Sequence, residues 1–296
     1  MIIPTITGDT GQHLIVVGGP TASGKTRLAI ALAQQYDTEI ISFDSRQCYR
    51  ELQIGVARPT VDELAEVPHH FIASHSIHSP INAAGFVQFA QPILTGLFEK
   101  RRVVVAVGGT GLYIHALVHG LDPIPSIDPS IRQLLDVSYR ENGLNWLQER
   151  IQAEDPLYAA SGEMRNPHRI LRALEVIRGT GKSIRLFQQH IQQENPFNTH
   201  WIGIDWDRET LYARINHRVE SMVEEGLGEE VQQLLPYASL QALQTVGYRE
   251  WIDYLNGSYS KEDAIRLIQQ NTRHYAKRQL TWFRRISNMQ WIKPVS

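Results

Sequence analysis

The residues near the N-terminus that are best suited to chemistry form a phosphate-binding loop. The stretch VVGGPTASGKTRLAI, residues 16–30, contains the pattern G-x-x-x-x-G-K-[ST] between an apolar run and an amphipathic stretch. In this pattern, glycines let the backbone close around an anion, N–H groups point at it, and the lysine adds positive charge. We therefore expect a bound polyphosphate, with Mg²⁺ as cofactor on the hydroxyl of Thr26. The members of the loop are Gly19, Pro20, Thr21, Ala22, Ser23, Gly24, Lys25 and Thr26.

One acidic residue lies where it could face this loop. In ISFDSRQCYR, residues 41–50, Asp44 directly follows the second β-branched run of the chain. Open α/β sheets present ligand-binding residues at the carboxyl ends of their strands, and the phosphate loop opens at the same edge. Asp44 could therefore be a magnesium ligand or a general base. A helix N-cap or a turn aspartate is the structural alternative.

Short β-branched runs indicate the sheet that would position these residues. They lie at 13–19, 38–45, 101–109 and 201–207, and the segments between the first three are long enough to hold helices. This rhythm is typical of a parallel sheet with helices on both faces. Together with the phosphate loop, it predicts an α/β fold with a parallel sheet core similar to that of P-loop NTPases.

The composition changes after the third of these runs. Residues 121–130, LDPIPSIDPS, carry three prolines, and the following stretch has helical patterning without a convincing strand. We therefore expect an inserted all-helical domain at 123–199, between core segments 1–122 and 200–296. The second core segment is expected to be mostly helical after its strand, with breaks near Pro236 and at Asn256–Gly257.

Composition limits the class of protein. Hydrophobic residues make up 42% of the chain, and 29 basic residues nearly balance 31 acidic ones, as in an ordinary soluble globular protein. The net charge of −2 neither indicates nor excludes a nucleic-acid partner. A single cysteine, Cys48, excludes an intrachain disulfide and favours a reducing compartment, so a cytoplasmic protein is expected. No apolar run resembles a signal peptide or is long enough to cross a bilayer.

Two signals of nucleotide hydrolysis are absent from the sequence. The Asn-Lys-x-Asp motif of GTPases does not occur, and the run VVVAVGGTG ends in glycines where a hydrolytic enzyme usually has a magnesium-binding aspartate. The sequence therefore disfavours a hydrolytic switch protein.

Blocks along nearly the whole chain resemble bacterial tRNA dimethylallyltransferases, also called tRNA isopentenyltransferases. The order of the blocks is that of the family. They read GPTASGKT, DSRQCYR, VPHHFI, GGTGLYIHALVHGL, DPSIR, NPHRILRALEVIRGTGKSI, VGYRE and AKRQLTWFRR. Departures are small: Cys48 replaces a commonly aliphatic residue, and VARP stands where TAKP is usual.

The resemblance implies prenyl transfer to tRNA. Such enzymes move a dimethylallyl group from its diphosphate to N6 of the adenosine 3′-adjacent to the anticodon, in tRNAs that read codons beginning with U. The loop would then hold the diphosphate, helped by Arg218, and Asp44 would accept the proton of the amine. The resemblance also implies that Thr110 and Arg132 contact the reacting groups; a structural role for Thr110 and a solvated position for Arg132 are the alternatives.

The expected partners are dimethylallyl diphosphate and the anticodon stem-loop of tRNA. Arginines between Glu163 and Arg185 and a basic, aromatic stretch from Arg273 to Arg285 suit phosphates and unstacked bases, although a solvated helix and core aromatics are alternatives. Gln47 is the candidate to read a base edge, because its amide both donates and accepts. The expected tRNA-binding residues are Asp44, Ser45, Arg46, Gln47, Pro167, His168, Arg169, Ile170, Leu171, Arg172, Gly247, Tyr248, Arg249, Lys277, Arg278, Gln279, Trp282 and Arg284.

Two other functions compete with this hypothesis. A small-molecule or nucleotide kinase would share the phosphate loop, with Asp44 positioning an acceptor hydroxyl, but it would not need the basic helical insertion. A non-catalytic RNA-binding ATPase is disfavoured by the absent hydrolytic motifs. No membrane association is expected, and the chain is expected to act as a monomer.

Overall fold

A computed structural model describes residues 11–160, 163–188 and 194–294 of the chain. The chain divides into two compact units. The larger unit is formed by Met1–His119 and Glu194–Ser296, and the smaller by Gly120–Gln193. Each unit is described by itself.

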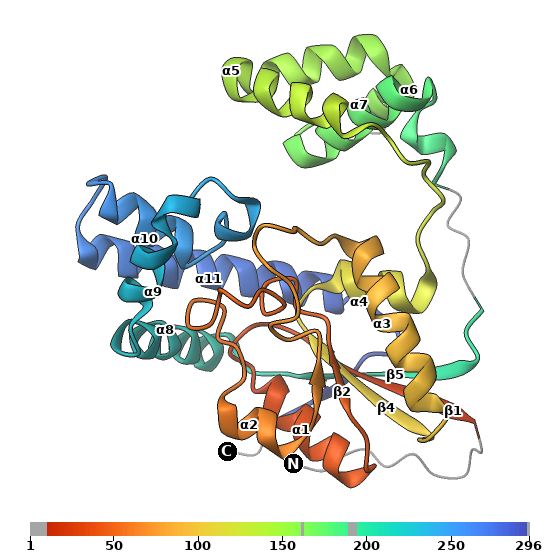
Figure 1. The fold of residues 1–296 in the computed structure, drawn as a ribbon, viewed down its shortest axis with the longest axis vertical. Helices are drawn as coiled ribbons and strands as arrows, with labels where there is room; N and C mark the ends of the chain where they lie inside the picture. Colours follow the sequence, from red (N-terminus) through yellow and green to blue (C-terminus); the bar gives the residue numbers. More distant parts are fainter. Residues whose placement is uncertain (1–10, 161–162, 189–193, 295–296) are drawn as a thin grey trace. The chain divides into compact units, whose positions relative to one another are not determined.

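The larger unit is built on one parallel six-stranded sheet (Figure 1). The strand order is β3-β2-β4-β1-β5-β6, and every neighbouring pair is parallel. The strands are β1 (Gln12–Gly18), β2 (Ile40–Ser42), β3 (His69–His70), β4 (Val103–Gly108), β5 (Phe197–Ile204) and β6 (Gln290–Ile292). From β1 the chain crosses to β2 beyond β4, whereas from β4 it returns to β5 on the other side of β1. The loops after β1 and β4 therefore flank the point where the connections diverge, which is where open α/β sheets bind ligands.

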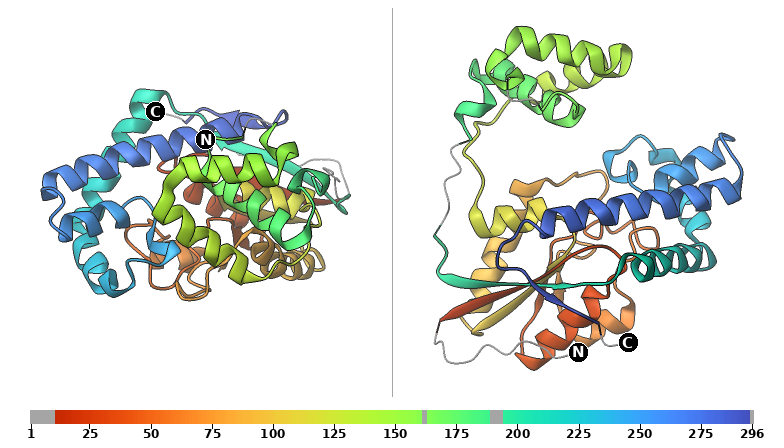
Figure 2. Two further views of the ribbon diagram at one scale, coloured as in Figure 1. Left: turned by 90° about the horizontal axis from the view of Figure 1, so that it is seen from above. Right: turned by 180° about the vertical axis from the view of Figure 1, so that it is seen from behind.

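Helices cover both faces of this sheet (Figures 1 and 2). Alternate residues of β1 and β4 point to opposite faces, and both sets are buried, which explains why these strands are continuously apolar. On one face Ile15 and Val17 pack in a cluster with Leu28 of α1; on the other, Leu14 packs in a cluster with Phe86 of α3. The helices of this unit are α1 (Lys25–Gln35), α2 (Val61–Glu66), α3 (Ala83–Phe98), α4 (Gly111–His119), α8 (Arg208–Glu224), α9 (Leu227–Leu234), α10 (Tyr248–Leu255) and α11 (Lys261–Phe283), with 3₁₀ turns at Leu235–Tyr237 and Gln241–Leu243.

Helix α11 packs closely against the ends of the central strands. A Cβ atom added to Gly18 would lie 2.2 Å from the ring of Phe283, and one added to Gly111 would lie 2.2 Å from the ring of Trp282. Both glycines are therefore required for this close approach. The packing places the C-terminal half of α11 beside the loops that follow β1 and β4.

The smaller unit is helical in its described residues and has its own core. Asp128 and Asn166 cap α5 and α7, and Pro129 and Pro167 each occupy the first helical position, where proline is favoured. Helix α5 changes direction at Gly143, whose backbone is not helical. The elements are α5 (Pro129–Glu154), α6 (Pro156–Ala159), α7 (Pro167–Thr180) and a 3₁₀ turn at Ile184–Leu186.

The four expected strands and the helical breaks near Pro236 and Asn256 are confirmed. The two edge strands β3 and β6 were not anticipated, because two or three residues carry too little pattern to recognise. Strand β5 begins at Phe197, three residues before the expected core segment at 200. The reason is tertiary, since Phe197 packs against Phe98 with ring centroids 5.3 Å apart. Among the described residues, no helix is long and apolar enough to span a membrane.

Candidate active site

The phosphate loop adopts the conformation that its glycines allow. Gly24 has a φ of 90°, which favours glycine, and it stands directly before the first turn of α1. Ala22 also lies in the left-handed region, at a φ of 62°. The backbone is therefore curved in the way that anion cradles require.

Side chains from distant elements hold this loop in shape. The indole Nε1 of Trp206 donates to the carbonyl of Ser23 at 2.9 Å, and Arg214 Nε donates to the carbonyl of Ala22 at 2.9 Å. The Arg214 guanidinium also lies over the Trp206 ring, 4.6 Å from its centroid. Within the loop, the buried Ser23 hydroxyl donates to the carbonyl of Pro20 at 2.9 Å. These contacts preorganise the loop.

Gln279 joins the phosphate loop to the end of β4. Its Oε1 accepts from the backbone N–H of Thr21 at 2.9 Å, and its Nε2 donates to the carbonyl of Gly109 at 3.0 Å. The side chain is 6% exposed. Sequence reasoning assigned Gln279 to tRNA binding, but in this structure both ends of its amide are engaged with the protein. Its observed role is to brace the loop.

Two cations reach the loop, and no carboxylate in the described part of the chain is hydrogen-bonded to either. Lys25 Nζ donates to the carbonyl of Pro20 at 2.5 Å, and Arg218 of α8 donates from Nη1 to Thr21 Oγ1 at 3.3 Å. Burial, reinforced by the positive charge of Arg218 and opposed by Asp44, lowers the pKa of Lys25 to about 7. Burial also lowers the pKa of Arg218. An anion placed here would relieve both effects.

Asp44 lies close enough to these cations to affect them electrostatically. Its negative charge raises the pKa of Lys25 and of Arg218, in opposition to burial. The Oδ1 atom of Asp44 accepts from the N–H groups of Arg46 at 2.9 Å and Gln47 at 3.2 Å. This is an Asx-type turn, so the structural alternative raised by the sequence is present. It uses one carboxylate oxygen and leaves Oδ2 for a ligand.

Thr110 connects the end of β4 to the loop after β2. Its Oγ1 accepts from the N–H of Ser45 at 3.1 Å and donates to Ser45 Oγ at 3.2 Å. Burial raises the pKa of Tyr275 of α11 to about 12, and the negative charge of Asp44 adds to this shift. Burial likewise raises the pKa of Cys48 to about 12, so this thiol is not a nucleophile. Tyr275 belongs to the basic, aromatic stretch that the sequence suggests for unstacked bases, and it precedes Gln279 by four residues on one helix face.

Gln47 and Arg46 are anchored by backbone carbonyls. Gln47 Nε2 donates to the carbonyls of Val56 at 3.2 Å and Ala57 at 2.8 Å, and Arg46 Nη1 donates to that of Gln241 at 3.4 Å. The carbonyl of Ala57 also accepts from Arg218 Nη2 at 3.2 Å. One carbonyl thus orients a residue of the phosphate site and a residue expected to read a base.

The donor set at the loop fits Mg²⁺ bound together with a substrate. Thr26 is half-buried in the first turn of α1, and Asp44 supplies a carboxylate nearby. Mg²⁺ commonly uses one or two such protein oxygens with substrate phosphates and water. In the described parts of the chain, no cluster of three or more His, Cys, Asp or Glu side chains could hold a metal by itself.

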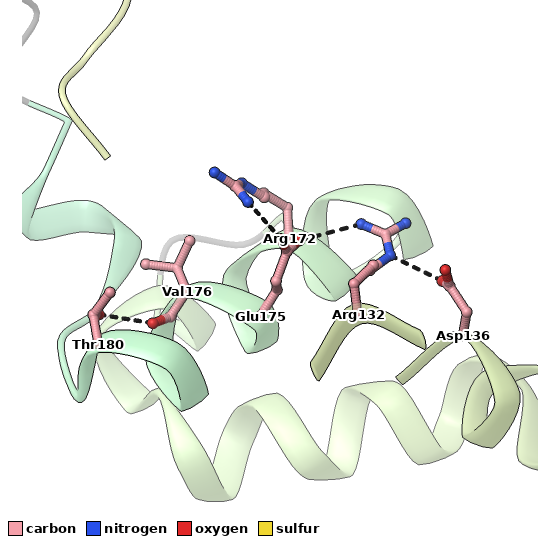
Figure 3. Close-up of polar contacts among 6 residues, drawn as sticks. All are labelled: Arg132, Asp136, Arg172, Glu175, Val176 and Thr180. Carbon is pink, nitrogen blue, oxygen red and sulfur yellow. Dashed lines mark hydrogen bonds and ion pairs between the residues drawn. The ribbon is translucent and has the colours of Figure 1, made fainter. Parts of the chain in front are cut away.

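Arg132, in the smaller unit, is engaged by two carboxylates (Figure 3). Its Nε lies 3.0 Å from Asp136 Oδ1, and its Nη1 lies 3.4 Å from Glu175 Oε2. Glu175 also pairs with Arg172 at 2.7 Å. Arg132 is therefore not simply solvated; its expected contact with substrate remains a proposal.

The residues expected to bind tRNA differ widely in exposure. Ile170, Leu171 and Tyr248 are buried at 2% exposure or less, so their side chains present no surface to RNA, and the sequence prediction is corrected for them. Trp282 packs against the apolar core, as the alternative interpretation had it. The exposed members include His168, Arg169, Lys277, Arg278 and Arg284.

Residues 166–169 and 247–250, which include expected tRNA-binding residues, also form the starts of helices. The N–H groups of His168 and Arg169 are used by the Asn166 cap of α7. The N–H of Gly247 donates to the buried carboxylate of Glu250 at 2.8 Å, which starts α10. Contacts of Gly247 and Arg249 with tRNA remain proposals.

Comparisons with known proteins agree along nearly the whole chain. A family model described as IPP transferase matches residues 47–286. The tRNA dimethylallyltransferase of Cytophaga hutchinsonii is 44% identical over 283 residues, which cover 96% of this chain and 93% of that protein. That of Christiangramia forsetii is 45% identical over 282 residues, covering 95% and 93%.

Solved structures are similar as well. The full-length tRNA isopentenylpyrophosphate transferase from Bacillus halodurans superposes with a TM-score of 0.70 at 38% identity, covering 95% of this chain and 90% of that one. A eukaryotic dimethylallyltransferase acting on tRNA has a TM-score of 0.78 at 24% identity, covering 95% and 74%, which shows a shared fold.

Proposed function

The chain belongs to the IPP transferase family, and from this premise we propose that it is a tRNA dimethylallyltransferase. It transfers the dimethylallyl group of dimethylallyl diphosphate to N6 of the adenosine 3′-adjacent to the anticodon, in tRNAs that read codons beginning with U. The observation that carries the proposal is the placement of one carboxylate, Asp44, beside a phosphate loop with two cations. The relatives bearing this name support the transferase class.

The phosphate loop stabilises the leaving group. When the allylic C–O bond breaks, its electron pair departs with the diphosphate and the negative charge there increases. Lys25, Arg218 and the amides of the loop offer fixed positive charge at that position. Because Trp206 and Arg214 brace the loop, little reorganisation is needed as charge develops.

Magnesium bound by Thr26 and the diphosphate would supply further charge neutralisation as a Lewis acid. The hydrogen bonds from the N–H groups of Arg46 and Gln47 to Asp44 Oδ1, here called the Oδ1 turn, would hold Asp44 in place whether or not the metal is present.

Asp44 accepts the proton of the nucleophile. The lone pair of adenine N6 is delocalised into the ring, so the amine attacks the allylic carbon only as its proton leaves. As the C–N bond forms, Asp44 Oδ2 takes this proton, a role worth about 10²–10⁴-fold in rate. The Oδ1 turn keeps the carboxylate from rotating. Thr110 holds the neighbouring Ser45 and thereby fixes the same loop.

The tRNA would be held by base and phosphate contacts of different kinds. The carbonyls of Val56 and Ala57 take both donors of Gln47 Nε2, so Gln47 reads a base edge as an acceptor, through Oε1. The exposed Arg278 contacts phosphate. Arg169 and Arg132 in the smaller unit would leave their carboxylate partners to meet substrate. We place the enzyme in the cytoplasm as a monomer, in keeping with its single buried cysteine.

A direct assay tests the proposal. The protein is incubated with Mg²⁺, radiolabelled dimethylallyl diphosphate and an unmodified tRNA that reads codons beginning with U. Label recovered in RNA, at the adenosine beside the anticodon, is the expected result. Transfer of phosphate from ATP to a small molecule, without prenylation of RNA, would identify a kinase and overturn the proposal.

A further inference from the structure

A carboxylate outside the phosphate loop clamps the segment of residues 53–57. Oε2 of Glu230, in α9, accepts from the N–H of Ile54 at 2.8 Å and of Gln53 at 3.1 Å. Oε1 accepts from the N–H of Gly55 at 3.1 Å and from the hydroxyl of Tyr248 at 2.5 Å. Hydrogen bonds to an ionised acceptor are the strong ones in proteins, so three successive backbone amides are fixed by one side chain.

Tyr248 completes the clamp from the other side. Its side chain is fully buried, and a Cβ atom added to Gly55 would lie 2.6 Å from its ring, so only glycine fits beneath it. Burial raises the pKa of Tyr248 well above its ordinary value, and the charge of Glu230 adds to the shift. The phenol therefore stays protonated at ordinary pH and keeps donating to Glu230.

The far end of the same segment presents one carbonyl to the active site. The carbonyl of Ala57 accepts from Gln47 Nε2 at 2.8 Å and from Arg218 Nη2 at 3.2 Å. Ala57 has a φ of 46°, in the left-handed region that is unfavourable for a non-glycine residue, so its surroundings must hold it there. Its N–H donates to the carbonyl of Ile54 at 2.8 Å, which ties it to the clamped amides.

We propose that Glu230 is a positioning residue for the transfer reaction, acting through the clamped loop, residues 53–57. Through the carbonyl of Ala57, it sets Arg218 toward the diphosphate and Gln47 toward the target base. This inference rests on the function proposed above. Glu230 touches no reacting atom. Through one carbonyl it affects both the binding of the diphosphate by Arg218 and the contact of Gln47 with the tRNA base.

Glu230→Gln is the test, with Glu229→Gln as its matched control. Glutamine keeps the size of the side chain but offers one acceptor oxygen and no charge to the three amides and the phenol. Glu229 is the exposed neighbour on the same helix, and its replacement removes the same charge. If the carbonyl of Ala57 shifts, the charged hydrogen bond that orients Arg218 is weakened, so E230Q is expected to raise the KM for dimethylallyl diphosphate and the Kd for pyrophosphate by roughly 10- to 100-fold. E229Q is expected to match the wild type.

A double-mutant cycle separates positioning from simple loss of structure. In a protein that already carries Arg218→Met, E230Q is expected to weaken pyrophosphate binding little further, because the guanidinium that Glu230 positions is absent. Additive effects would overturn the inference, as would wild-type binding of pyrophosphate and tRNA by folded E230Q.

If E230Q does not fold, Tyr248→Phe is the second variant. It removes one hydrogen bond to the same carboxylate and is expected to weaken pyrophosphate binding several-fold; no change would overturn the inference. Pyrophosphate binding is measured without prenyl transfer, so failure of the proposed function is distinguishable.

Discussion

The two cations of the phosphate loop and the arginines of the smaller unit have partners of opposite kinds. In the larger unit, Lys25 and Arg218 donate to carbonyls and a hydroxyl, which carry no net charge. In the smaller unit, Arg132, Arg172 and Arg178 donate to carboxylates at 2.7–3.4 Å. The first set is half-buried and has no hydrogen-bonded carboxylate among the described residues, whereas the second is paired with carboxylates.

The two sets of cations should therefore respond differently to an anion. A cation without a bonded carboxylate gains the whole electrostatic interaction with an arriving diphosphate, because its desolvation already occurred when the chain folded. A paired arginine must exchange a carboxylate for a phosphate, so the net gain is small and is screened by salt. We expect strong, localised anion binding in the larger unit and weaker, salt-sensitive binding in the smaller.

The largest effect is expected at Asp44, whose negative charge acts on both Lys25 and Arg218. Asp44→Asn should lower kcat by about 10²–10⁴-fold and leave tRNA affinity intact, because only the proton acceptor is lost. Asp44→Ala should lower kcat at least as much, and it also removes the acceptor for the N–H groups of Arg46 and Gln47. Asparagine preserves the acceptor of the Oδ1 turn, so D44N isolates the chemical role from the structural one. Single-turnover kinetics and tRNA binding are the measurements. Unchanged turnover in D44N would remove Asp44 from proton transfer.

Removing an uncompensated cation should cost more than removing a paired one. Arg218→Met is expected to weaken pyrophosphate binding by about 10- to 100-fold, because charged hydrogen bonds near a buried anion are lost. Arg178→Met, which breaks the 2.7 Å pair with Glu154 in the smaller unit, is the control and should leave that affinity unchanged. Calorimetry measures both. Equal losses of pyrophosphate affinity in the two variants would contradict the distinction between the phosphate-loop cations and the paired arginines.

Lys25 should make anion binding depend on pH. With its pKa lowered to about 7, the free lysine loses its proton above neutrality, whereas a bound anion favours the charged form and raises the pKa. Affinity for pyrophosphate should therefore fall above pH 7 by up to about tenfold per pH unit. Below pH 7, the titration of Lys25 should not change this affinity.

Lys25→Arg serves as the reference for this experiment, since arginine keeps its charge throughout and the titration of pyrophosphate itself cancels in the comparison. Parallel curves for the two proteins would contradict a lowered pKa at Lys25.

The smallest effect is expected where arginines are already paired. Replacing Arg169 and Arg172 together by alanine should weaken tRNA binding several-fold and reduce its salt slope by about 1–2, because two phosphate contacts are lost. Glu163→Gln should act oppositely, since it releases Arg169 from a 2.6 Å ion pair. Filter binding over a range of salt concentrations measures both. An unaltered salt slope would mean that this helix face does not meet the RNA backbone.

Part of the fold could be predicted because its signals are local. The strand run ending at Gly18, the loop at Gly19–Thr26 and the helix begun by Pro129 each follow from neighbouring residues. Arg218 and Gln279 were named from the family pattern, and packing then gave Gln279 a different partner than expected. Glu230 was not anticipated, since a lone glutamate in an amphipathic helix carries no sequence signal of its distant contacts.

Glycine spacing, a lysine and a strand pattern act over a few residues, and they are enough to predict that a polyphosphate cradle follows the first strand of a parallel sheet. The packing of distant elements sets which described cations lie beside that cradle without a hydrogen-bonded carboxylate, and which carboxylate fixes the carbonyl between Gln47 and Arg218. Hydrogen bonds and burial between residues more than 150 positions apart depend on how elements pack, and a short-range pattern cannot encode that arrangement.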